Sequence, residues 1–132
     1  LALGADHAMV VHSYDGLDEI SISAPTHVCE VIDGEIRDYI LDPEELGVER
    51  APIEAIAGGD STENARIARA VLSGESNGPC RDIVAVNAGA ALYVSGAVPT
   101  LRDGVALATD TIASGAAMRK LEELASATKE LA

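Results

Sequence analysis

Near its start the chain runs Ala8-Met9-Val10-Val11-His12-Ser13-Tyr14-Asp15-Gly16, and this segment indicates the class of fold. Its apolar part, Ala8 to His12, is short and does not alternate with polar residues, as is typical of a buried parallel strand. Asp15-Gly16 predicts a turn directly after it. Because ligands of open α/β sheets bind beyond the carboxyl ends of strands, a functional site is expected at this turn.

An antiparallel hairpin is predicted next. The runs His27 to Ile32 and Glu35 to Leu41 are joined by Asp33-Gly34, which is a strong hairpin signal. Alternation along the first of these strands places Val28 and Glu30 on the same face. The region therefore predicts antiparallel strands attached to a core that begins as parallel.

Two shorter segments flank the hairpin. Glu19 to Ser23 is rich in β-branched residues and is also expected to be a strand. Pro43 follows the hairpin, where it ends the strand and suits the first turn of a short helix through Leu46. Gly47 to Ile56 is expected to be irregular.

The second half of the chain is predicted to be helical. Asp60 is a cap residue for a helix that ends at Gly74. The segment 83–94 is apolar nearly throughout, and its length favours a buried helix over a strand. Leu101 to Ile112 and Leu121 to Thr128 then repeat apolar residues at helical spacing, so the chain ends in about four helices.

Composition excludes several classes of protein. Nine basic against 22 acidic residues give a net charge of −13, which argues against binding to nucleic acid or to an anionic membrane surface. No apolar run reaches the roughly 18 residues that a membrane span needs. With no Phe and no Trp, the core must consist of Ala, Val, Ile and Leu. Cys29 and Cys80 share no metal-ligand spacing and are expected to be reduced thiols of a cytosolic protein.

The acidic cluster Asp15, Asp18 and Glu19 directly follows the first strand. Carboxylate oxygens at a turn can converge on Mg²⁺, which usually binds one or two carboxylates together with waters and substrate phosphates. A bridging magnesium ion is also a way for an acidic protein to hold a diphosphate. The alternative is a solvated turn without a ligand.

Three other features have two interpretations each. His12 is either a general base beside the acidic cluster or a hydrogen-bonded residue at a sheet edge. Gly58-Gly59-Asp60 is either an anion site before a helix or, as the negative charge of Asp60 favours, a cap with a tight turn. Asn87, in a run of small residues, either positions a neighbouring loop or, as the sequence favours, serves packing. No catalytic residue is assigned.

Several segments together resemble one known family. They are, in chain order, Val10 to Ser21 with its D-G-L-D-E string, Ala24-Pro25-Thr26, Leu41-Asp42-Pro43, Gly58-Gly59-Asp60, Glu63-Asn64-Ala65, Arg81-Asp82-Ile83-Val84, Asn87 to Tyr93, Gly115-Ala116-Ala117 and Lys120-Leu121. In this order they are similar to the anthranilate phosphoribosyltransferases. The similarity covers nearly the whole chain, so it is far more specific than any single motif.

The resemblance implies a fold and an activity. The fold would be α/β, the C-terminal part of a mixed, mostly parallel sheet domain of the nucleoside phosphorylase/phosphoribosyltransferase kind, with an antiparallel hairpin and several C-terminal helices. The family joins anthranilate to the ribose carbon of phosphoribosyl pyrophosphate (PRPP) and releases pyrophosphate, a step of tryptophan biosynthesis. Its Asp-Glu pair holds Mg²⁺ on the pyrophosphate, and this role maps onto Asp18 and Glu19. A cytoplasmic homodimer is expected.

Other parts of the family pattern are absent from this chain. Residues 1–132 would be the C-terminal portion of the α/β domain, whereas the G-T-G-G-D loop, the K-H-G-N segment, the anthranilate-contacting arginine and the N-terminal helical domain of the dimer contact are missing. The start at Leu1, without an initiator Met, suggests a piece of a longer domain that is inactive alone. Two alternatives stay open: a non-catalytic structural or regulatory domain of the same fold, and a related transferase with another aromatic acceptor.

Overall fold

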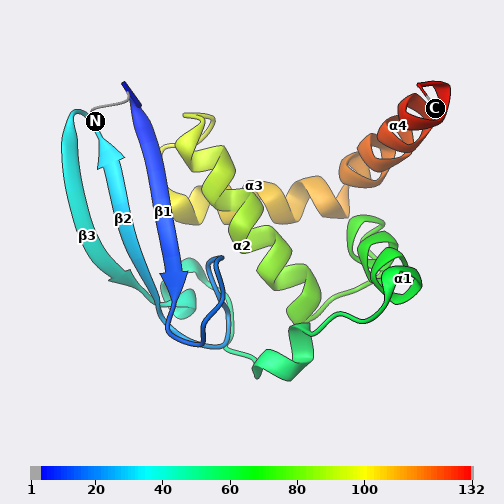
Figure 1. Ribbon diagram of the computed structural model, residues 1–132, viewed down its shortest axis with the longest axis horizontal. Helices are drawn as coiled ribbons and strands as arrows, with labels where there is room; N and C mark the ends of the chain where they lie inside the picture. Colours follow the sequence, from blue (N-terminus) through cyan, green and yellow to red (C-terminus); the bar gives the residue numbers. More distant parts are fainter. Residues whose placement is uncertain (1–3, 132) are drawn as a thin grey trace.

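The computed structural model describes residues 4–131, so the start at Leu1 lies outside the described residues. A three-stranded sheet forms one side of the molecule, the long α2 and α3 helices cross in the middle, and α1 and α4 lie on the far side (Figure 1). The elements in chain order are β1 (His7–Ser13), β2 (Thr26–Ile32), β3 (Glu35–Leu41), the 3₁₀ helices η1 (Pro43–Leu46) and η2 (Ile53–Ile56), α1 (Ser61–Leu72), α2 (Pro79–Val94), α3 (Leu101–Ala113) and α4 (Ala116–Glu130). The α/β class and the helical second half are confirmed.

The sheet has the order β1-β2-β3, and both of its pairings are antiparallel. The predicted hairpin between β2 and β3 is confirmed, and Asp33 and Gly34 at its turn both have positive φ, 54° and 77°, as the tight two-residue hairpin turn requires. Thr26, Val28 and Glu30 are all buried on one face of β2, which confirms the predicted alternation.

The first strand differs from the expectation of a buried parallel strand. Within the described residues β1 lies at the sheet edge and pairs only with β2, antiparallel, through partners such as Val11 and Val28. Val10 is 70% exposed. A short apolar run is found both in strands covered by helices on two faces and in edge strands, so the sequence alone does not separate the two cases.

The expected strand over Glu19 to Ser23 is also wrong. This segment contains bends and no strand, because its backbone groups bond to side chains instead of to a neighbouring strand. It belongs to the connection between β1 and β2, residues 14–25, which we call the β1–β2 loop.

The core lies between the inner face of the sheet and the α2 and α3 helices. It consists mostly of aliphatic side chains, as the composition requires. The α2 and α3 helices touch through their backbones where Gly89 meets Gly104, since a Cβ added to Gly89 would lie 2.5 Å from the Val105 nitrogen. The small residues of α2 thus permit the close approach that its sequence suggested.

The helix boundaries follow local signals. The Asp60 carboxylate accepts a hydrogen bond from the Glu63 N–H at 2.9 Å, so the predicted cap of α1 is confirmed. The helix ends at Leu72, and Gly74, with φ of 79°, follows the C-cap residue Ser73. None of the helices among residues 4–131 combines the length and the apolar character that crossing a membrane would need. Cys29 and Cys80 are free thiols in the structure.

Candidate functional site: the β1–β2 loop and its supports

The β1–β2 loop carries the acidic cluster and lies beside α2 (Figure 1). Two backbone hydrogen bonds close its ends, from the Tyr14 N–H to the Pro25 carbonyl and from the Ser13 N–H to the Leu17 carbonyl, both at 3.0 Å. Gly16 lies at its tip with φ of 96°, a left-handed conformation that other residues rarely adopt. The turn that the sequence predicted at Asp15-Gly16 is therefore present.

Asp15 braces this loop from within. Its carboxylate accepts hydrogen bonds from the Ser21 hydroxyl at 2.5 Å, from the Ser23 hydroxyl and from the Leu17 N–H at 3.2 Å. Burial alone would raise the pKa of Asp15, but these bonds, together with one from Ser13, favour the charged form and lower the pKa to about 2. Because its oxygens are engaged by the loop itself, Asp15 acts as a support and not as a free ligand.

Asn87 supports the loop from outside. It lies on α2, and its side-chain oxygen accepts a hydrogen bond from the Ile20 N–H at 3.0 Å. Its NH₂ group donates to the Ile20 carbonyl at 2.9 Å and to the Ile83 carbonyl at 3.0 Å. The Ile20 side chain is only 1% exposed, so this peptide is pinned against the core. The structure supports positioning of a neighbouring loop by Asn87, and not the packing role that the sequence favoured.

Asp18 and Glu19 lie between these two supports. Both residues are exposed and occupy a bend, and neither side chain forms a hydrogen bond or ion pair with any residue from 4 to 131. The described residues contain no group of three or more His, Cys, Asp or Glu side chains placed to hold a metal ion. Two hard carboxylate oxygens nevertheless fit Mg²⁺, because this ion usually takes one or two protein carboxylates and fills its other positions with waters and phosphates.

His12 lies apart from this arrangement. It is exposed and pairs in register with His27, on the face of β1 opposite to the buried Ser13. The β1–β2 loop is held on the other side of the sheet, against α2. This placement gives no support to a general-base role for His12. Gly58-Gly59-Asp60 forms the cap of α1, the interpretation that the sequence favoured.

The sequence analysis missed a buried group, Glu30. It is 4% exposed, and its carboxylate accepts hydrogen bonds from His7 at 2.8 Å and from the Tyr39 hydroxyl at 3.1 Å. Burial acts to raise the pKa of Glu30, but the bonds from His7, Tyr93 and Tyr39 outweigh it and lower the pKa. The sequence did contain a signal for this buried group, since alternation along β2 places Glu30 on the same face as the apolar Val28. Because His7 and Tyr39 already hydrogen-bond the Glu30 carboxylate, we assign these residues a structural role.

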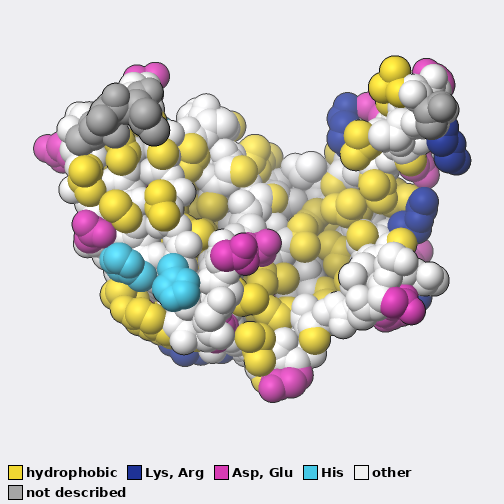
Figure 2. Space-filling view, in the orientation of Figure 1, with side chains coloured by type: hydrophobic (Ala, Val, Ile, Leu, Met, Phe, Trp, Pro, Cys, Tyr) yellow, Lys and Arg dark blue, Asp and Glu magenta, His cyan; other side chains and the backbone are white. Residues whose placement is uncertain are grey.

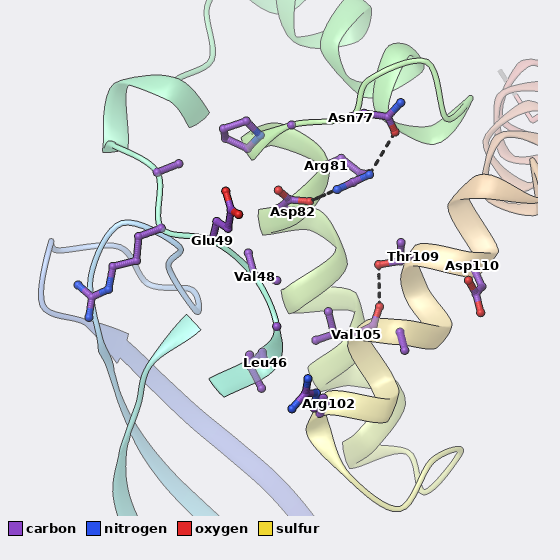
Figure 3. Close-up of a pocket in the computed structure, with 16 residues that line it drawn as sticks. Leu46, Val48, Glu49, Asn77, Arg81, Asp82, Arg102, Val105, Thr109 and Asp110 are labelled. Carbon is purple, nitrogen blue, oxygen red and sulfur yellow. Dashed lines mark hydrogen bonds and ion pairs between the residues drawn. The ribbon is translucent and has the colours of Figure 1, made fainter. Parts of the chain in front are cut away.

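A polar cavity of about 790 Å³ lies between residues 46–51, the start of α2 and the α3 helix (Figure 3). Arg81 reaches across its wall and donates hydrogen bonds to Asp82 at 3.0 and 2.5 Å and to Asn77 at 3.1 Å. The lining residues include none from the β1–β2 loop. The cavity is thus separate from the acidic pair. Of its three arginines, Arg50 is paired with Asp42 and Arg81 with Asp82, whereas Arg102 forms no hydrogen bond or ion pair with residues 4–131.

A second hollow is apolar. Figure 2 shows the face of the molecule indented between the sheet and the α1 and α4 helices, with hydrophobic side chains across it. A cavity of about 400 Å³ lies among the four α helices and is lined by residues such as Val84, Ala88 and Ile112. It offers almost no polar group that would orient a substrate, so it is not a candidate for chemistry.

The fold and the loop define the class of protein. Residues 1–118 match the family described as glycosyl transferase family, a/b domain, and the chain belongs to this family. Its relatives include anthranilate phosphoribosyltransferases of Marinomonas sp. (strain MWYL1), 50% identical over 97% of this chain, and of Clostridium beijerinckii, 52% identical over 96%. The chain spans about 37% of the length of these two relatives.

Solved structures agree. The anthranilate phosphoribosyltransferase of Thermus thermophilus matches 89% of this chain with a TM-score of 0.81 and 46% identity, over 34% of its own length. The Saccharomyces cerevisiae enzyme in complex with PRPP and Mg matches 86% with a TM-score of 0.76 and 29% identity, over 33% of its length. The resemblance seen in the sequence is therefore confirmed, and so is the phosphoribosyltransferase-like fold.

Proposed function

We propose that the protein containing this chain transfers the phosphoribosyl group of PRPP to anthranilate and releases pyrophosphate, within tryptophan biosynthesis. In this transfer a bond forms between the anthranilate nitrogen and the ribose carbon, the bond from that carbon to the pyrophosphate oxygen breaks, and the nitrogen loses a proton. The observation that carries the proposal is the Asp18-Glu19 pair, exposed on a loop whose flanks are fixed, in a chain about half identical to enzymes of that name over nearly its whole length.

Asp18 and Glu19 would hold Mg²⁺, which when bound neutralises charge on the departing pyrophosphate. A Saccharomyces cerevisiae relative was solved with PRPP and Mg, and another structure of it contains 4-fluoroanthranilate. The role of this chain is then to supply two carboxylate oxygens at a fixed place. Asp15, Ser21 and Asn87 hold the loop and leave those oxygens free.

The rest of the proposal concerns the complete polypeptide. The segments missing here, namely the glycine-rich PRPP loop, the anthranilate-contacting arginine and the helical domain, would lie upstream of this part of the α/β domain. A homodimer through that helical domain and a cytoplasmic location are further parts of the proposal.

Neutralising the pair tests the function. In the complete polypeptide, Asp18→Asn with Glu19→Gln should raise the magnesium concentration needed for half-maximal rate by roughly tenfold or more and lower turnover, because loss of direct carboxylate ligands weakens metal binding. The measurement is pyrophosphate release from PRPP and anthranilate over a magnesium series.

The matched control is Glu54→Gln with Asp110→Asn, which removes two exposed carboxylates outside the β1–β2 loop and should leave the magnesium curve unchanged. An unaltered curve for the Asp18 and Glu19 variant would remove the pair from the site. No transfer by the wild-type polypeptide with any aromatic acceptor would favour the non-catalytic alternative.

A further inference from the structure

Asn87 makes a specific contact with the segment that carries the acidic pair. Its amide binds both backbone groups of Ile20, the residue directly after Glu19: it accepts from the Ile20 N–H at 3.0 Å and donates to the Ile20 carbonyl at 2.9 Å. The remaining N–H donates to the Ile83 carbonyl, one turn earlier on α2, at 3.0 Å. The amide oxygen and both N–H groups of Asn87 are therefore hydrogen-bonded, which fixes the orientation of the side chain.

The contact joins the loop to a helix that is packed into the core. The α2 helix contains the fully buried Ala85 and Val86 and meets α3 backbone to backbone at Gly89. A loop bonded to such a helix is held in place by it. The bonds that the Ser21 and Ser23 hydroxyls donate to Asp15, in contrast, connect only loop residues to one another.

The two sets of bonds hold the acidic pair from both sides. Asp15 fixes the segment before it, and Ile20 and Ser21 fix the segment after it, the latter also through a bond from its N–H to the Thr26 hydroxyl at 3.1 Å. The only connection within this set that reaches α2 is the one from Asn87. Ile20 and Ile22 also pack in the core, so without the Asn87 bonds the loop would stay attached, but the Ile20 peptide would lose its hydrogen-bonding partner on α2.

We infer that Asn87 is a positioning residue for the metal site: by holding the Ile20 peptide on α2 it sets where the Asp18 and Glu19 carboxylates stand, and so sets their affinity for the divalent cation. The inference rests on the proposed function, since it assumes that the pair binds metal. Asn87 itself is not a ligand, because its three polar contacts are all to backbone atoms.

The test measures metal binding rather than turnover. Mn²⁺ replaces Mg²⁺, and electron paramagnetic resonance of free Mn²⁺ gives the affinity of the complete polypeptide in the presence of PRPP. Asn87→Ala should weaken Mn²⁺ binding roughly tenfold, as is typical when a group that orients a metal ligand is lost. Amide hydrogen exchange without metal should become faster at Ile20 in the same variant.

The chain offers a closely matched control in Asn64. Its side chain holds the Gly59 peptide in the same way, accepting from the Gly59 N–H at 2.8 Å and donating to the Gly59 carbonyl at 3.1 Å, but in the loop before α1. Asn64→Ala removes an equivalent pair of bonds and should leave Mn²⁺ affinity unchanged. An equal loss in Asn64→Ala and Asn87→Ala would overturn the inference, because the effect would then be general destabilisation.

Other outcomes are also decisive. If Asn87→Ala binds Mn²⁺ as tightly as the wild type while its Ile20 amide exchanges faster, then fixing the Ile20 peptide does not affect metal binding, and the inference is wrong. If that variant does not fold, Asn87→Asp keeps the acceptor for the Ile20 N–H and loses the donors, and it should show the same weakening; unchanged affinity there would refute the inference. If Asp18→Asn with Glu19→Gln binds Mn²⁺ like the wild type, the proposed function itself fails.

Discussion

At the scale of single residues, the β1–β2 loop separates two kinds of carboxylate. Asp15 is enclosed by hydroxyl and N–H donors, whereas Asp18 and Glu19, three and four positions later, are exposed. The three residues look equivalent in the sequence. Hydrogen bonds alone assign Asp15 to holding the loop and leave the other two for a ligand.

Asp15 predicts a pH-dependent stability. Its pKa is lowered to about 2, below the ordinary value of about 3.9, so the native state favours the charged form. The resulting stabilisation is fully present above about pH 4 and is lost as the pH falls toward 2. Asp15→Asn should therefore lower the free energy of unfolding by about 1–2 kcal/mol at neutral pH, after allowance for solvent screening.

The measurement is urea unfolding of wild type and Asp15→Asn at several pH values. The difference between them should shrink as the pH approaches 2. Asp110→Asn, a change at an exposed position on α3, serves as the control and should show little difference at any pH. A difference for Asp15→Asn that stays constant from pH 7 to pH 2 would contradict the assigned role of this carboxylate.

Residue roles were predictable only in part. The position of Asp18 and Glu19 after the first strand could be read from the sequence, because turn and strand signals are local. The contact between Asn87 and Ile20 joins residues 67 positions apart, and no local pattern specifies it. The burial of Glu30 was implied by alternation, but its partner His7 comes from another strand.

At the scale of elements, α2 and α3 cross in backbone contact. A Cβ on Gly104 would lie 2.2 Å from the Gly89 oxygen, and one on Gly89 would lie 2.5 Å from the Val105 nitrogen. Both obstacles are backbone atoms, which cannot rotate away. The two glycines therefore set the distance between the helices, and α2 in turn carries Asn87.

Gly89→Ala should destabilise the protein by about 2–3 kcal/mol, because the methyl group must push the helices apart. Gly78→Ala at the start of α2 is the matched change: a Cβ there meets nothing within 4 Å, and the cost should stay below about 1 kcal/mol, that of a poorer helix cap. Chemical denaturation measures both. Equal effects of the two changes would show that the crossing is looser than described.

Elements were predictable where their signals were local. The hairpin turn at Asp33-Gly34, the cap at Asp60 and the helix over residues 79–94 all follow from neighbouring residues. The pairing of β1 was not predictable, because burial on one or both faces depends on what packs there. The bends over residues 19–23 were missed because side-chain acceptors replaced strand partners.

At the scale of the whole molecule, we propose that this chain supplies one component of an active site. It spans about 37% of the length of the relatives cited, and its apolar hollow and its polar cavity lie away from the acidic pair. Two carboxylates can hold a metal ion on a diphosphate, and a mostly apolar pocket of about 330 Å³ adjoins Ile20 and Asn87. The anthranilate-contacting arginine that the family resemblance implies is not in this chain.

We therefore expect the 132-residue chain alone to be catalytically inert. Pyrophosphate release from PRPP and anthranilate should stay at the level of a blank without protein, whereas the complete polypeptide should turn over under the same conditions. The complete polypeptide bearing the Asp18 and Glu19 substitutions controls for contaminating activity. Steady transfer by the purified chain would contradict this expectation.

The central claim is that Asp18 and Glu19 bind the cation that carries the diphosphate of PRPP. Crystals of the complete polypeptide grown with PRPP and Mn²⁺ test it directly, since anomalous scattering locates the metal. We predict a manganese peak about 2.0–2.3 Å from a carboxylate oxygen of Asp18 or Glu19, bridged to the pyrophosphate. A metal bound to the pyrophosphate with both side chains directed into solvent would contradict the claim.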